Sequence, residues 1–133
     1  MTVKMILRSL LAVFVINFGV SVYADTPTYT EDKTSIVADV KQLTFIIKLK
    51  SNPTTGYSWF LREYDADLIT PVKHEFQQPE KKLIGAPGFE LWTFRMKHAA
   101  FTVPQQTALR FVYARPWQGA DNSTQVVFRV TTH

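Results

Sequence analysis

The chain has 133 residues with 15 Lys+Arg and 11 Asp+Glu, a formal net charge of +4, and no cysteine. Hydrophobic residues make up 46% and aromatic residues 14%, a composition that suits one folded domain and excludes a disordered chain. The lack of cysteine excludes disulfide frameworks, thiolate metal sites, cysteine nucleophiles and lipid attachment at a cysteine. The three histidines, His74, His98 and His133, do not favour a multi-histidine metal site. The net positive charge is small and the sequence has no long run of Lys and Arg, so nucleic acid is not an expected partner.

Residues 1–24 have the pattern of a secretory signal peptide. Lys4 and Arg8 precede an apolar run that is short for a membrane span, and Ala24 supplies a small residue for cleavage. We therefore expect an exported protein, periplasmic or secreted, that makes no membrane contact after signal cleavage. Its mature domain is expected to be residues 25–133. An uncleaved N-terminal anchor is the alternative.

The mature chain shows the alternation of β-strands and no helical periodicity. Apolar and polar residues alternate clearly in segments 43–50, 92–97, 109–114 and 126–131. Weaker strands are expected within 35–40, 57–64 and 72–77. Strands with one polar face each predict an all-β fold, a two-sheet antiparallel β-sandwich.

Glycine and proline gather in three short segments of the mature chain. These are Asn52-Pro53-Thr54-Thr55-Gly56, Gly85-Ala86-Pro87-Gly88 and Arg115-Pro116-Trp117-Gln118-Gly119. We expect two strands between the first and second segments, turning near 65–71, and two between the second and third, turning near 100–106. An even number of strands returns an antiparallel chain to the end that it left. All three segments are therefore expected at one end of the sandwich.

The first and third segments have the residues of binding loops. Pro53 fixes its own φ and restricts Asn52, while Gly56 can adopt a positive φ, so the first segment is a stiff projecting turn or an ordinary hairpin connection. Trp117 beside Arg115 combines residue types that are frequent in binding hot spots. Packing of Trp117 in the core is the alternative.

The other notable side chains are expected to be structural. Trp59 and Trp92 lie in strands and are most simply core residues, and His74 and His98 are expected on strands without a metal. No serine elbow, phosphate-binding glycine loop or metal-ligand spacing is present, so an enzyme is not expected. A binding module with three preformed loops is the favoured class. An enzyme with an unrecognised arrangement of residues is a weaker alternative.

The three segments resemble the three motifs of the chagasin-type inhibitors of papain-like cysteine peptidases. The first motif extends through Tyr57-Ser58-Trp59, and all three occur in the family's order over essentially the whole mature chain. The middle motif departs from the family pattern Gly-x-Gly-Gly, because Pro87 replaces one glycine and stiffens the loop.

The resemblance implies an immunoglobulin-like antiparallel β-sandwich of about seven to eight strands that reversibly blocks the active-site cleft of a papain-like cysteine peptidase. It implies that Thr54 and Thr55 sit over the catalytic cysteine–histidine pair while the other two loops grip the walls of the cleft. The implied peptidase-binding residues are Asn52, Pro53, Thr54, Thr55, Gly56, Tyr57, Gly85, Ala86, Pro87, Gly88, Phe89, Arg115, Pro116 and Trp117. No cofactor or metal is expected, and the protein is expected to be a monomer. An exported immunoglobulin-like adhesion or ligand-binding module is the alternative function.

Overall fold

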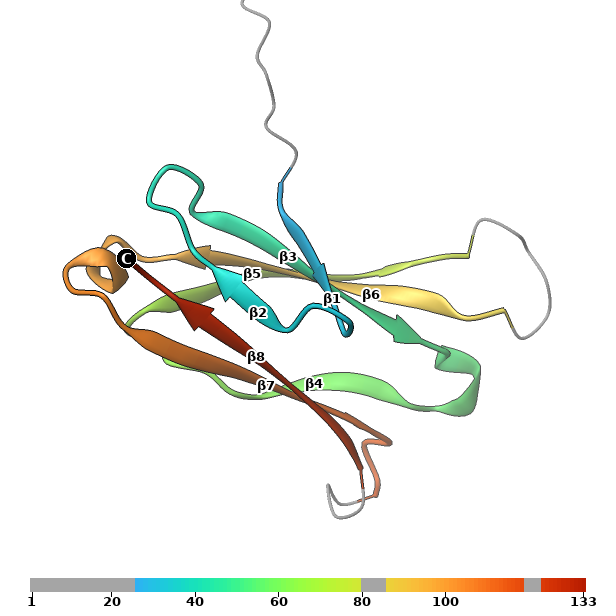
Figure 1. The fold of residues 1–133 in the computed structure, drawn as a ribbon. Helices are drawn as coiled ribbons and strands as arrows, with labels where there is room; N and C mark the ends of the chain where they lie inside the picture. Colours follow the sequence, from blue (N-terminus) through green and yellow to red (C-terminus); the bar gives the residue numbers. More distant parts are fainter. Residues whose placement is uncertain (1–25, 80–85, 119–122) are drawn as a thin grey trace, which may run out of the picture.

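The computed structural model describes residues 26–79, 86–118 and 123–133, which form two four-stranded β-sheets packed face to face (Figure 1). One sheet has the strand order β1-β3-β6-β5 and the other β2-β8-β7-β4. The strands are β1 (Thr28–Thr30), β2 (Ser35–Val37), β3 (Thr44–Ser51), β4 (Ser58–Glu63), β5 (Ile69–Gln77), β6 (Gly88–Met96), β7 (Gln106–Ala114) and β8 (Thr124–Thr131). Two short 3₁₀ helices, η1 (Pro53–Thr55) and η2 (His98–Phe101), complete the described elements. The all-β sandwich confirms the predicted fold class.

Seven of the eight described strands lie where the sequence predicted strands. The four clearly alternating segments form β3, β6, β7 and β8, and the three weaker ones form β2, β4 and β5. Strand β1 was not predicted, because no alternating segment of the sequence includes Thr28–Thr30. It pairs in parallel with β3, and β2 pairs in parallel with β8, whereas the remaining pairs are antiparallel. The sandwich is therefore antiparallel except where its two short N-terminal strands join.

The core is apolar and rich in aromatic rings from both sheets. Fully buried side chains include Phe94 and Ile47 from one sheet and Phe111 and Phe128 from the other. Phe111 contacts both Phe94 and Phe128 edge to face, with ring centroids 6.0 and 5.9 Å apart. Burial of a large apolar side chain stabilises a fold by about 1.5–3 kcal/mol, so this core makes the two sheets a firm support for their connecting loops.

One end of the sandwich is closed by η2, the start of β7 and the C-terminal residues (Figure 1). The buried hydroxyl of Thr132 donates to the carbonyl oxygen of Ala100 at 2.8 Å and accepts from the backbone N–H of Gln105 at 3.2 Å. His98 lies in η2, so its predicted place on a strand was wrong. Strand β6 ends at Met96, the last residue paired with β5, and Lys97 is the N-cap of η2, so His98 begins the 3₁₀ helix.

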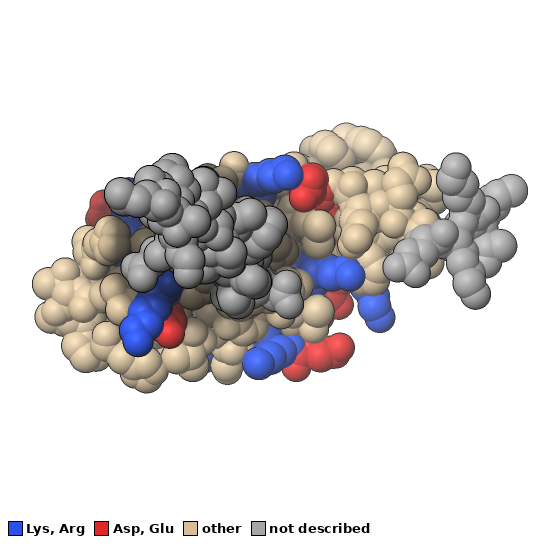
Figure 2. All heavy atoms as spheres, turned by 90° about the horizontal axis from the view of Figure 1, so that it is seen from above, with Lys and Arg blue, Asp and Glu red and all other residues tan. Residues whose placement is uncertain are grey.

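Charges are scattered over the face of the molecule that Figure 2 shows. Lys and Arg side chains there are separated by Asp, Glu and uncharged surface. Within the described ranges, no group of three or more acidic or histidine side chains could hold a metal ion. No helix among these residues is long and apolar enough to cross a membrane.

Candidate binding site

The stems of the three glycine- and proline-rich segments lie at the end of the sandwich opposite η2 (Figure 1). Ser51, which precedes the first segment, pairs with Gly88 of the second. Ser58, which follows the first segment, pairs with Ala114, which precedes the third. The prediction from strand parity is thereby confirmed for the segment stems. Gly85 and residues 119–122 lie outside the described residues.

The first segment is a 3₁₀ turn braced by its own side chains. The Asn52 side chain caps it by accepting from the N–H of Thr54 at 3.3 Å and from its hydroxyl at 2.6 Å. The hydroxyl of Thr55 donates to the carbonyl oxygen of Asn52 at 2.7 Å. Gly56 ends the turn with φ +79°, the left-handed conformation predicted for it, and donates its N–H to the carbonyl oxygen of Pro53 at 3.1 Å. A turn with so many internal hydrogen bonds is held in one shape before any partner arrives.

The third segment is fastened onto the first. Arg115 donates from Nε to the carbonyl oxygen of Thr55 at 3.0 Å, and its guanidinium lies over the Tyr57 ring at 4.6 Å. The Trp117 ring is 6.0 Å from the same guanidinium, and a Cβ atom placed on Gly56 would lie 2.9 Å from its Cη2 atom. Trp117 is nevertheless 71% exposed, so the predicted exposed position is confirmed and the core alternative is wrong.

The middle segment divides between a loop and a strand. Ala86 and the exposed Pro87 precede β6, whereas Gly88 and Phe89 begin it. A Cβ atom on Gly88 would lie 2.4 Å from the Phe76 ring and 2.6 Å from a backbone oxygen, so this position requires glycine for space. Phe89 is half-buried under the ammonium group of Lys48, 4.1 Å from the ring centroid.

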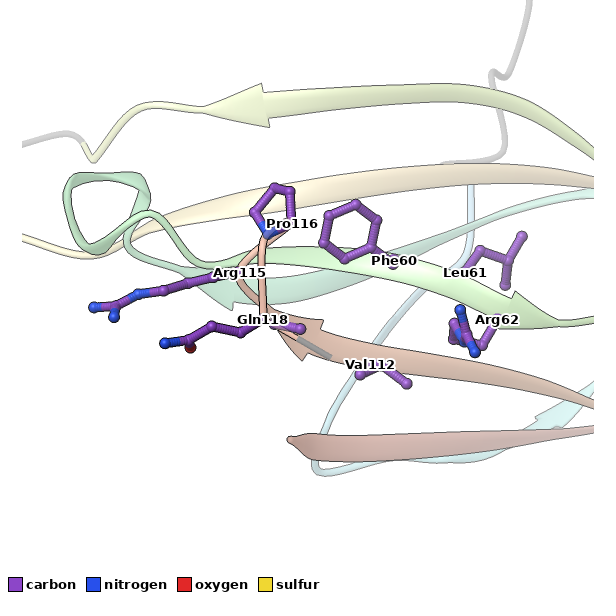
Figure 3. A pocket seen from close by; sticks show the side chains of 8 residues that line it. Phe60, Leu61, Arg62, Val112, Arg115, Pro116 and Gln118 are labelled. Atoms are coloured by element: carbon purple, nitrogen blue, oxygen red, sulfur yellow. The ribbon is translucent and has the colours of Figure 1, made fainter. Parts of the chain in front are cut away.

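A shallow groove of about 440 Å³ lies beside the base of the third segment (Figure 3). Its apolar lining includes Phe60, Val112 and Pro116. The side chains of Arg115 and Gln118 extend away from Arg62, which lies at the other end of the groove. The Arg115 guanidinium thus turns out of the groove and toward the first segment, where its hydrogen-bond partner lies.

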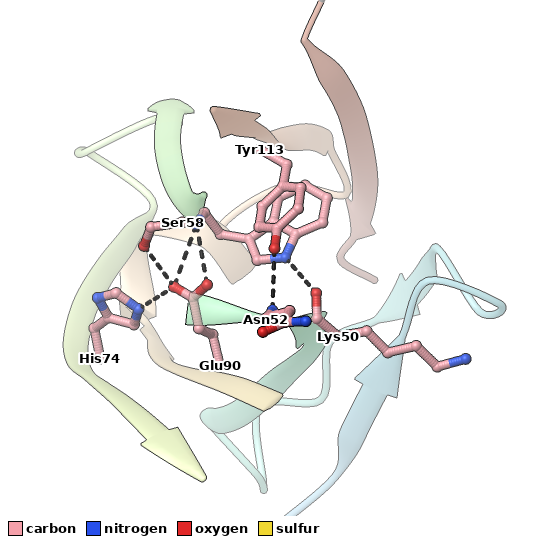
Figure 4. A network of polar contacts seen from close by, with 7 residues as sticks. Lys50, Asn52, Ser58, His74, Glu90 and Tyr113 are labelled. Atoms are coloured by element: carbon pink, nitrogen blue, oxygen red, sulfur yellow. Dashed lines mark hydrogen bonds and ion pairs between the residues drawn. The ribbon is translucent and has the colours of Figure 1, made fainter. Parts of the chain in front are cut away.

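A polar network around a buried carboxylate, beneath the first and middle segments, was not predicted (Figure 4). Glu90, 4% exposed, accepts at Oε1 from Nε2 of His74 at 2.7 Å and from the hydroxyl of Ser58 at 3.2 Å. Its two carboxylate oxygens also lie 3.3 and 3.1 Å from the backbone N of Trp59. His74, expected to be an ordinary strand residue, also stacks on Trp92 with ring centroids 3.8 Å apart. The available sequence signal was Glu90 itself, a carboxylate on the side of its strand that faces the core.

Comparisons with known proteins agree with this architecture. The family model described as Chagasin family peptidase inhibitor I42 matches residues 40–132. The chain is 31% identical over 83 residues to chagasin from Trypanosoma cruzi, which covers 59% of this chain and 71% of that protein.

Solved structures of three proteins share the fold. A cysteine protease inhibitor from Entamoeba histolytica superimposes with a TM-score of 0.64 at 18% identity, covering 81% of this chain and 95% of that one. Amebosin superimposes with a TM-score of 0.58 at 22% identity, covering 81% and 98%. PbICP-C, solved in complex with falcipain-2, superimposes with a TM-score of 0.54 at 16% identity, covering 82% and 90%.

Proposed function

Because the chain belongs to the chagasin family of peptidase inhibitors, we propose that it inhibits papain-like cysteine peptidases by filling their active-site cleft with three loops. The loops are those around η1, the start of β6 and the segment 115–118. The protein acts as an inhibitor and not as an enzyme, and it needs no cofactor or metal. A monomer is sufficient, since all three loops come from one chain.

The observation that carries this proposal is the attachment of the third loop to the first. Arg115 joins them by its hydrogen bond to Thr55 and by its contact with Tyr57, while Trp117 lies exposed beside Gly56. Loops that are ordered before binding lose little conformational entropy when they bind. An exposed tryptophan next to an arginine is a frequent energetic centre of an interface. The edge formed by the first and third loops is therefore suited to binding in the cleft of a peptidase.

The geometry of the first loop accounts for inhibition without cleavage. A peptidase nucleophile attacks a carbonyl that is held about 3–3.5 Å away in a suitable orientation. The carbonyl oxygens of Asn52, Pro53 and Thr55 all accept hydrogen bonds within the protein. The 3₁₀ turn that they form is not an extended, substrate-like strand. In this mechanism Thr54 and Thr55 occupy the space over the catalytic pair while no peptide bond lies in position for attack.

We also propose that the protein is exported, to the periplasm or beyond, after cleavage of residues 1–24. The support is the charge and hydropathy pattern of that segment. The mass of the product made by a bacterial host distinguishes cleavage, which leaves residues 25–133, from an uncleaved membrane anchor.

Titration of papain tests the proposed function directly. The purified protein is added to a fixed concentration of active papain, and hydrolysis of a fluorogenic peptide is followed. We expect a stoichiometric loss of activity, and mass spectrometry should find the inhibitor intact after prolonged incubation. Unchanged hydrolysis at micromolar protein would instead favour an adhesion or ligand-binding module. Progressive cleavage at the first loop would contradict the mechanism.

Replacement of Arg115 by lysine tests the attachment between the loops. Lysine keeps the positive charge but lacks Nε–H in the guanidinium plane, so it cannot both donate to Thr55 and stack on Tyr57 in the same way. We expect binding to papain to weaken by about 1–2 kcal/mol, the sum of an exposed cation–π contact and a hydrogen bond. The inhibition constant measures this loss. Arg95→Lys, at an exposed residue of β6 far from the three loops, is the matched control.

A further inference from the structure

Glu90 links the stems of two candidate binding loops. It follows Gly88 and Phe89 of the middle segment, and its partners Ser58 and Trp59 are the first residues of β4 after the first segment. The carboxylate is buried, and an ionised carboxylate only accepts hydrogen bonds, so three groups of donors converge on it. Loss of this acceptor leaves the buried N–H of Trp59 unpaired.

Trp59 extends the connection to the third loop by a hydrogen bond and a ring contact. Its indole Nε1 donates to the carbonyl oxygen of Lys50 at 2.9 Å, and its ring stacks on Tyr113 with centroids 4.8 Å apart. The Tyr113 hydroxyl accepts from the N–H of Asn52 at 3.1 Å. Tyr113 lies on β7 two residues before Arg115. One continuous set of contacts therefore joins the stems of all three loops.

We propose that Glu90 is a positioning residue for peptidase inhibition, which sets the first loop relative to the middle and third loops through Trp59 and Ser58. This inference rests on the proposed function. A buried carboxylate adds no contact area to a peptidase, but it restricts how far the loop stems can move apart. Loops that sample several relative positions must be ordered during binding, which lowers affinity.

A pair of substitutions at position 90 separates hydrogen bonding from volume. Glu90→Met keeps an unbranched side chain of similar length and removes both acceptor oxygens. Glu90→Gln keeps one acceptor oxygen for Trp59 and replaces the other by an NH₂ group. That group can donate to the Ser58 hydroxyl and to Nε2 of a neutral His74 that carries its proton on Nδ1. We expect the inhibition constant for papain to rise at least tenfold in Glu90→Met and to return to within about threefold of wild type in Glu90→Gln.

The matched control lies at the other end of the sandwich. Thr132→Val removes a buried hydroxyl that binds Gln105 and Ala100, so it lowers thermal stability without touching a loop stem. Its inhibition constant should stay within twofold of wild type. If Glu90→Met fails to fold, His74→Phe replaces it, because phenylalanine preserves the stack on Trp92 and removes the Nε2 donor. The inference is overturned if loss of inhibition simply follows loss of melting temperature, so that Thr132→Val weakens inhibition as much as an equally destabilised variant at Glu90 or His74.

Amide hydrogen exchange of the free protein gives a second readout that needs no peptidase. The N–H of Asn52 donates to the Tyr113 hydroxyl, so its exchange reports on the contact between the stems of the first and third loops. In Glu90→Met this exchange should accelerate at least tenfold relative to that of η2, and in Thr132→Val it should not. Equal acceleration at both ends would refute the positioning role. Failure of wild-type protein to inhibit papain would refute the proposed function, while the exchange pattern still decides the role of Glu90.

Discussion

Replacement of Trp117 by alanine is expected to weaken inhibition of papain by about 2–4 kcal/mol, or about 30- to 1,000-fold. The ring is 71% exposed in the free protein, so much of its apolar surface is available for burial against a peptidase. Its neighbours Arg115 and Gly56 hold it on one side, which limits the entropy lost on binding. Inhibition constants for the variant and the wild type measure the effect.

Folding should hardly change in the same variant. Substitutions of exposed side chains usually alter the free energy of unfolding by less than about 0.5 kcal/mol. Tyr64→Ala is the matched control, because Tyr64 is also an exposed aromatic residue but follows β4 at the opposite end of the molecule. Its inhibition constant should equal that of the wild type. If Trp117→Ala inhibits as strongly as wild type, Trp117 is not an anchor of the complex.

Replacement of Gly56 by valine is expected to weaken inhibition by about 1–3 kcal/mol, for two reasons. A β-branched residue rarely adopts a φ of +79°, so the turn must distort. The added Cβ atom would also lie 2.9 Å from the Trp117 ring and push the third loop outward. Inhibition constants together with urea unfolding of the variant separate loss of binding from loss of stability.

Gly56→Asn distinguishes the two causes. Asparagine tolerates the left-handed conformation better than valine but carries the same Cβ atom. Strong recovery of inhibition in Gly56→Asn would assign the defect to the backbone, and equal weakness would assign it to the contact with Trp117. Wild-type inhibition by Gly56→Val would contradict both explanations.

Sequence patterns predicted the structure best where a local pattern has a local physical cause. Alternation in segments such as 43–50 and 126–131 reflects one buried and one solvated strand face, and it correctly predicted β3 and β8. Proline and glycine at 53 and 56 restrict or release φ within a single turn, so the conformation of Gly56 was also predicted. The common end of the loop stems followed from counting strands, because antiparallel chains reverse direction at each turn.

Other features depend on contacts between distant residues. Strand β1 is defined by its pairing with β3 and has no pattern of its own. The partners of Glu90 come from β4 and β5, and Arg115 meets Thr55 across 60 positions of sequence. No local preference specifies such partners, since they depend on which strands become neighbours and on the register between them.

The amino-acid sequence by itself determined the β-sandwich class, the positions of the three loops along the chain and the family to which the chain belongs. It could do so because strand burial patterns and turn conformations depend on residues that are neighbours along the chain. Only the tertiary structure decided that Trp117 projects into solvent and that Glu90 joins the loop stems. Both depend on sheet packing, which brings together side chains that are far apart along the chain.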